Sequence, residues 1–117
     1  MNRIVMLAVA GLAALGIGAA SVGAATPKLI GTVADPLKIS LTQNGKKVTH
    51  LKAGAYVIIV QDTASDHNFH LTGPGVNKTT TVGGKGVFRW NVKLSKGTYT
   101  YVCDPHSSFM KGSFTVS

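Results

Sequence analysis

The chain after residue 25 is divided into short runs of β-branched and aromatic residues, which are separated by Gly, Pro, Asn and Asp. Such runs are typical of β-strands, and none of them shows the extended periodicity of a long helix. About seven or eight strands at regular spacing predict an all-β fold, either an antiparallel β-sandwich or a Greek-key barrel. Periodicity alone does not choose between these two architectures.

Alternation along the runs predicts which side chains face the core. A nearly continuous apolar run over 55–61 predicts a buried central strand, and Asn44-Gly45 is a strong signal for a hairpin turn. The predicted inward faces carry Leu37, Ile39 and Leu41; Phe88, Trp90 and Val92; Tyr99, Tyr101 and Cys103; and Phe114 and Val116.

The first 25 residues have the pattern of a secretory signal peptide. A short positive start precedes an uncharged apolar run over 4–20, and Val22-Gly23-Ala24-Ala25 offers small residues for cleavage. Cleavage is expected after Ala24 or Ala25, and with cleavage after Ala25 residues 26–117 form one domain. An uncleaved membrane anchor is the alternative, because the run is close to the lower length limit for spanning a bilayer. With cleavage, we expect a monomer without a membrane span in the periplasm, the cell envelope or the extracellular space.

The charge of the chain is strongly positive. Its formal net charge is +8 at pH 7, with 12 Lys and Arg against four Asp, and these basic residues are scattered rather than clustered. Nucleic-acid-binding proteins usually cluster Lys and Arg beside exposed aromatic residues, so no nucleic-acid partner is expected. The charge indicates either an ordinary exported surface or a preference for an acidic partner or an anionic envelope surface.

The segment 103–110, with the sequence CDPHSSFM, carries the only cysteine and the only methionine outside the N-terminal 25 residues. A single cysteine in an exported protein calls for intermolecular pairing, a reactive thiol or a metal. Cys103 is predicted to end a strand with its sulfur toward the core, and Pro105 breaks that strand. The chain must then turn, which can bring His106 and Met110 back toward the sulfur. Thiolate, imidazole and thioether are donors that favour copper.

A fourth donor must come from another strand, and the candidates are His50, His67 and His70. In 67–71 the alternate positions 67, 69 and 71 share a face that Phe69 and Leu71 mark as core. His67 is therefore predicted to point inward and His70 outward, unless a strand bulge exchanges their faces. His50 lies in a polar hairpin. We choose His67.

With these residues in place, the chain resembles the cupredoxins, the blue-copper family that includes plastocyanin, azurin, amicyanin and pseudoazurin. The resemblance covers essentially all of 26–117 and is strongest from Ala55 to Val116. In that family a His-Asn pair supplies the first histidine ligand, here His67-Asn68, and the asparagine ties the ligand loop to the neighbouring strand. The C-terminal loop supplies the other ligands, here Cys103, His106 and Met110.

The ligand spacing combines two patterns of the family. Two residues separate Cys103 from His106, as in plastocyanin and amicyanin, whereas three separate His106 from Met110, as in azurin. Zinc would accept the Cys and His donors but would gain little from Met110. A two-copper centre or an iron–sulfur cluster needs more than one cysteine.

The resemblance implies one copper ion that cycles between Cu(I) and Cu(II), in a type 1 copper protein that carries single electrons between redox partners in the cell envelope. The alternatives are a module for copper storage or delivery and a structural sandwich with an incidental cysteine.

Redox partners with acidic docking surfaces are expected. Phe109, with Pro74 and Val76, would form an apolar docking patch around His106, unless Phe109 serves only loop packing. An enzyme is not expected, because the chain shows neither a Ser–His–Asp order nor paired carboxylates.

Overall fold

The computed structural model describes residues 25–117, so the predicted signal peptide lies outside the described residues except for Ala25. No helix in this described part is long and apolar enough to cross a membrane. Its elements are β2 (Lys28–Ala34), β3 (Lys38–Gln43), β4 (Lys46–Lys47), β5 (His50–Leu51), β6 (Gly54–Asp62), β7 (His70–Gly73), β8 (Val76–Thr79), β9 (Gly86–Leu94), β10 (Gly97–Val102), the 3₁₀ helix η3 (Asp104–His106) and β11 (Lys111–Val116).

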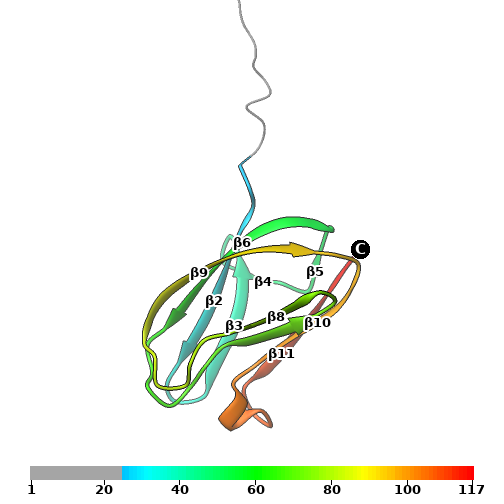
Figure 1. The fold of residues 1–117 in the computed structure, drawn as a ribbon. Coiled ribbons are helices and arrows are strands. Elements are labelled where there is room, and N and C mark those ends of the chain that lie inside the picture. The colour runs from blue at the N-terminus through cyan, green and yellow to red at the C-terminus, as the bar shows by residue number, and fades with distance from the viewer. Residues whose placement is uncertain (1–24) are drawn as a thin grey trace, which may run out of the picture.

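Two five-stranded sheets pack face to face over one apolar core (Figure 1). The strand orders are β5-β11-β10-β7-β8 and β4-β3-β2-β6-β9. Neighbours such as β2 and β6, or β7 and β10, are distant in sequence, because the chain crosses between the sheets. The prediction of an all-β fold is confirmed, and the chain adopts the sandwich, one of the two predicted architectures. The structure has more strands than the seven or eight predicted. Strand β2 was not expected, and β4 and β5, with two residues each, are too short to give a sequence pattern.

The sheets are mixed rather than wholly antiparallel as predicted. Strand β2 pairs with β6 in parallel, and β5 pairs with β11 in parallel. The physical reason is the path of the chain, since β5 belongs to the other sheet and lies between β3 and β6 in sequence. When the chain returns, β6 enters beside β2 in the same direction, which a crossover allows and a hairpin does not.

Most predicted faces agree with the observed burial. Strand β6 lies between β2 and β9 and is largely buried, and the inward residues of β9, β10 and β11 are buried or half-buried. Asn44 and Gly45 have φ values of 52° and 80°, which fits the tight turn expected between β3 and β4. The prediction that Leu37 faces the core is wrong. Leu37 is 47% exposed because it belongs to the turn before β3 rather than to the strand.

The connection between β10 and β11 is the feature that places the predicted donors. Val102 and Lys111 face each other as the last pair of the antiparallel β10–β11 ladder. Residues 103–110, here called the 103–110 loop, therefore lie at one end of the sandwich, where η3 is seen in Figure 1. We call this end the loop end. The chain enters β2 at the opposite end.

Candidate metal centre

The 103–110 loop is closed by backbone hydrogen bonds of its own. The amide of Cys103 donates to the carbonyl of Met110 at 3.0 Å, and the amide of His106 donates to the carbonyl of Cys103 at 3.0 Å. The amide of Met110 donates in turn to the carbonyl of His106 at 2.8 Å. Pro105 suits this tight turn because it fixes its own φ and needs no hydrogen-bond acceptor. The loop thus returns on itself within eight residues, as the sequence predicted.

Three donor atoms converge beneath the loop. The Nδ1 atoms of His67 and His106 are 3.1 Å apart, and Cys103 Sγ lies 3.7 Å from His67 Nδ1 and 3.5 Å from His106 Nδ1. A point in their plane that is equidistant from the three atoms lies about 2 Å from each, close to the length of metal–nitrogen and metal–sulfur bonds in proteins. The side chains present therefore fit a single metal ion.

The partners of His67 fix which of its nitrogens can bind a metal. The ring is buried, and its Nε2 lies 2.9 Å from the carbonyl oxygen of Pro36. A carbonyl can only accept, so Nε2 carries the proton in the neutral ring and Nδ1 keeps its lone pair. That lone pair faces Cys103 and His106. The hydrogen bond to Pro36 thus selects the tautomer that a metal needs.

The sulfur of Cys103 is enclosed by the protein and receives a backbone hydrogen bond. Cys103 is free and fully buried, and the backbone amide of Asn68 donates to its sulfur at 3.5 Å. This contact helps to hold the sulfur where it faces the Nδ1 atoms of His67 and His106.

The Asn68 side chain connects the loop to the rest of the sandwich. Its Oδ1 accepts from the amide of Asp104 at 2.7 Å, and its Nδ2 donates to Asp104 Oδ2 at 2.8 Å. Nδ2 also donates to Thr79 Oγ1 at 3.1 Å and to the carbonyl of Thr80 at 3.3 Å. Asn68 is itself only 2% exposed. The buried Asn68 side chain thus ties the 103–110 loop, at Asp104, to Thr79 and Thr80.

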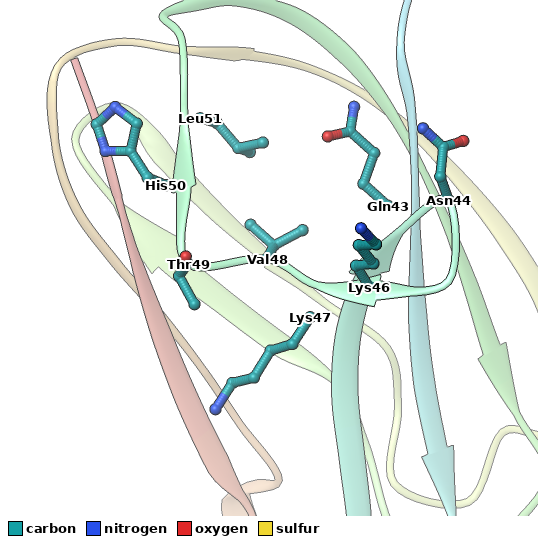
Figure 2. A pocket seen from close by; sticks show the side chains of 8 residues that line it. All are labelled: Gln43, Asn44, Lys46, Lys47, Val48, Thr49, His50 and Leu51. Atoms are coloured by element: carbon teal, nitrogen blue, oxygen red, sulfur yellow. The ribbon is translucent and has the colours of Figure 1, made fainter.

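The other candidate residues have separate positions. Met110 ends the loop with its side chain fully buried in the core cluster. The Nδ1 atoms of His67 and His106 and the sulfur of Cys103 are called the donor triangle. His70 is not part of the donor triangle and binds Asp104 and Asn77 instead. His50 lines a pocket near β4 and β5 (Figure 2), where its ring nitrogens contact the hydroxyls of Thr115 and Ser117.

Comparison with known proteins agrees with this geometry. A sequence profile described as copper binding proteins of the plastocyanin/azurin family matches residues 38–117. The chain belongs to this family, the cupredoxins. Copper is the metal of the family, and the donor triangle of this cupredoxin suits one copper ion.

Solved structures show the same fold. This cupredoxin is similar to reduced rusticyanin, with a TM-score of 0.60, 19% identity and coverage of 81% of both chains. It is also similar to rusticyanin from Thiobacillus ferrooxidans, with a TM-score of 0.56, 20% identity and coverage of 81% of this chain and 79% of that one. No curated protein sequence matches the chain.

A contact that the sequence did not indicate joins His70 to the loop. His70 Nδ1 lies 3.0 Å from both carboxylate oxygens of Asp104, and His70 Nε2 lies 2.7 Å from Asn77 Oδ1. The hydrogen bonds to Asn77 and Asp104 raise the pKa of His70 above 6.5, and those from Asn68 and His70 lower the pKa of Asp104 below 3.8. No spacing rule would pair His70 with Asp104, because the two residues are 34 positions apart in sequence.

These shifts predict a pH dependence of stability. His70 stabilises the fold fully below its unfolded pKa of 6.5, and this contribution is lost as pH rises through the higher folded pKa. The Asp104 contribution is instead lost as pH falls through its lowered pKa. In urea unfolding of the metal-free protein, the stability advantage of the native chain over His70→Gln should therefore be larger near pH 6 than near pH 9. An advantage that stays constant across this range would contradict the role of His70.

Proposed function

We propose that this cupredoxin is a type 1 copper protein that carries single electrons between redox partners. This proposal rests on one observation, which is that His67 Nδ1, Cys103 Sγ and His106 Nδ1 lie within 3.7 Å of one another. We propose these three residues as the metal ligands and Met110 as the weak fourth ligand, a set typical of blue copper sites. Copper, when bound, supplies the one-electron Cu(I)/Cu(II) couple.

The residues around the ligands would keep the site nearly unchanged when the charge on the metal changes. Asn68 holds Asp104 through both side-chain groups, and the Cys103–Met110 backbone bond closes the loop. His67 is held at its other nitrogen by Pro36. Ligands that are fixed before electron transfer need little rearrangement, which favours a fast exchange of electrons.

His106 is the proposed exit for electrons. It is half-buried, whereas the side chains of His67, Cys103 and Met110 are fully buried. Phe109 in the same loop is 75% exposed. The predicted grouping of Phe109 with Pro74 and Val76 is wrong, because Pro74 packs at Gly97, the far end of β10 from the loop.

Other exposed apolar residues replace Pro74 and Val76 at the loop end. Leu37 directly follows Pro36, whose carbonyl contacts His67, and Val82 and Val87 lie in or beside the β8–β9 connection. That connection also reaches the site, because the carbonyl of Thr80 binds Asn68. Exposed apolar side chains around an electron exit support brief docking with partner proteins.

The partners and the location follow from charge and from the N-terminal pattern. We propose redox proteins with acidic docking surfaces, because the chain has a net charge of +8. Residues 1–25 are proposed as a cleaved export signal and 26–117 as a monomeric domain of the periplasm, the cell envelope or the extracellular space. We propose a carrier rather than an enzyme, in keeping with the family.

Redox cycling of the copper-loaded domain tests this function. We expect its visible absorption to vanish on reduction and to return on oxidation over repeated cycles, while an excess of a copper chelator removes little metal over hours. Cycling measures the carrier role, and chelator challenge measures retention. If copper instead passes within seconds to a metal-free acceptor protein and the colour does not return, the protein is a copper-delivery module.

A further inference from the structure

The outward nitrogen of His67 faces two carboxylates in addition to the Pro36 carbonyl. Asp35 Oδ1 lies 3.1 Å and Asp66 Oδ1 lies 3.8 Å from His67 Nε2. The His67 side chain is 1% exposed, whereas those of Asp35 and Asp66 are 69% and 66% exposed. A buried ring is therefore bordered by negative charge on the side that faces away from Cys103.

The Pro36 carbonyl alone would be enough to fix the tautomer of His67, so the carboxylates must be judged by their charge. A carboxylate near the N–H of a metal-binding histidine draws on its proton and makes the opposite nitrogen a better electron donor. Negative charge at this distance also favours the more highly charged state of a metal. Both effects stabilise Cu(II) relative to Cu(I), which means a lower reduction potential.

The arrangement is specific to one of the two histidines. Within residues 25–117, the ion pairs of histidine involve His67 and His70, and His106 has none. The half-buried His106 thus stays free of a carboxylate at the proposed electron exit, while the buried His67 carries two. This asymmetry separates the residue that would set the potential from the residue that would meet the partner.

We propose that Asp35, assisted by Asp66, is a positioning residue that acts through His67 by its charge and lowers the reduction potential of the copper site. The inference rests on the proposed function, because it requires His67 to bind the metal. Asp35 should act more strongly than Asp66, since its oxygen is 3.1 Å rather than 3.8 Å from Nε2.

The first test is the reduction potential of the copper-loaded Asp35→Asn variant, which keeps the shape of the side chain and removes its charge. We expect the ratio of Cu(I) to Cu(II) affinity to rise on the order of tenfold, equivalent to a potential about 59 mV higher. Asp66→Asn should give a smaller rise, and Asp35→Glu should restore most of the native value. Unchanged or lower potentials in both Asn variants would overturn the proposal.

A control must separate local charge from net charge. Thr49→Lys also raises the net charge by one, but Thr49 is exposed in the pocket near β4 and β5 (Figure 2). Its carbonyl accepts from the amide of Thr115, which pairs with Thr98 at the end of the β10–β11 ladder opposite the 103–110 loop. We expect it to leave the potential almost unchanged, because an exposed charge far from the site is screened by solvent. A rise equal to that of Asp35→Asn would assign the effect to net charge and would overturn the role of Asp35.

A second test needs no copper. In the metal-free protein, NMR should show the Nε2 proton of His67, and its resonance should move upfield in Asp35→Asn as the charged acceptor is lost. An unmoved resonance would contradict the positioning role. Failure of the proposed function looks different, since a copper-loaded His67→Ala variant that keeps its visible absorption would remove His67 from the site whatever Asp35 does.

Discussion

Copper-loaded Cys103→Ser is expected to lose the intense visible absorption of the native protein completely. That absorption requires a thiolate bound to Cu(II), and Cys103 is the only cysteine in the chain. A serine hydroxyl at this buried position cannot replace it, because it does not ionise near neutral pH and is a poor ligand for copper. Titration of the purified domain with Cu(II), followed by visible spectroscopy, measures the effect.

Two histidine variants provide the comparison for this experiment. His67→Ala should also lose or strongly weaken the absorption, because its Nδ1 belongs to the donor triangle. His70→Ala removes an imidazole only three residues away that binds Asp104 and Asn77 instead, so it should keep the absorption. A colourless native protein, or a coloured Cys103→Ser variant, would refute the proposed ligand set.

Gly73→Ala is expected to be the most damaging small substitution for stability. A Cβ atom at Gly73 would overlap the ring of Tyr99, which is fully buried and stacks on Phe114 with ring centroids 5.3 Å apart. The Tyr99 hydroxyl also accepts from the Ser95 amide at 2.9 Å. Moving this ring would disturb the core at several points, so we expect a loss of about 3 kcal/mol in the free energy of unfolding, measured by urea denaturation.

Gly83→Ala serves as the matched control. A Cβ atom there would meet no heavy atom within 4 Å, and Gly83 does not have the positive φ that an alanine would resist. This variant should keep the native stability or gain up to about 1 kcal/mol through a less flexible unfolded chain. Similar losses in both variants would show that the Tyr99 ring can move at little cost.

The sequence was sufficient for the fold class and for the direction of Cys103. Alternation in 98–103 placed Cys103 on the same face as Tyr99 and Tyr101, and all three side chains are buried. His67 was chosen on similar grounds and does lie beside Cys103, but the premise was partly wrong. Strand β7 begins at His70, and residues 67–69 before it are all buried without alternating.

What could not be predicted depends on contacts between distant segments. Strand β2 was missed, although Leu29 and Val33 in it are fully buried, because its glycine and threonine residues weaken the pattern of apolar alternation. The carbonyl partner of His67 Nε2 belongs to Pro36, which lies in a turn 31 residues away in sequence. Local patterns carry no information on such pairs, which arise only when two sheets have packed together.

The closure of the 103–110 loop has one more consequence. Its two ends are fixed by the Cys103–Met110 hydrogen bond and by the last pair of the β10–β11 ladder. Between them, Ser107, Ser108 and Phe109 are exposed. Residues can therefore be added or removed there with little effect on the sheets, since surface loops tolerate changes of length. The length of the 103–110 loop can thus vary while the two sheets stay the same.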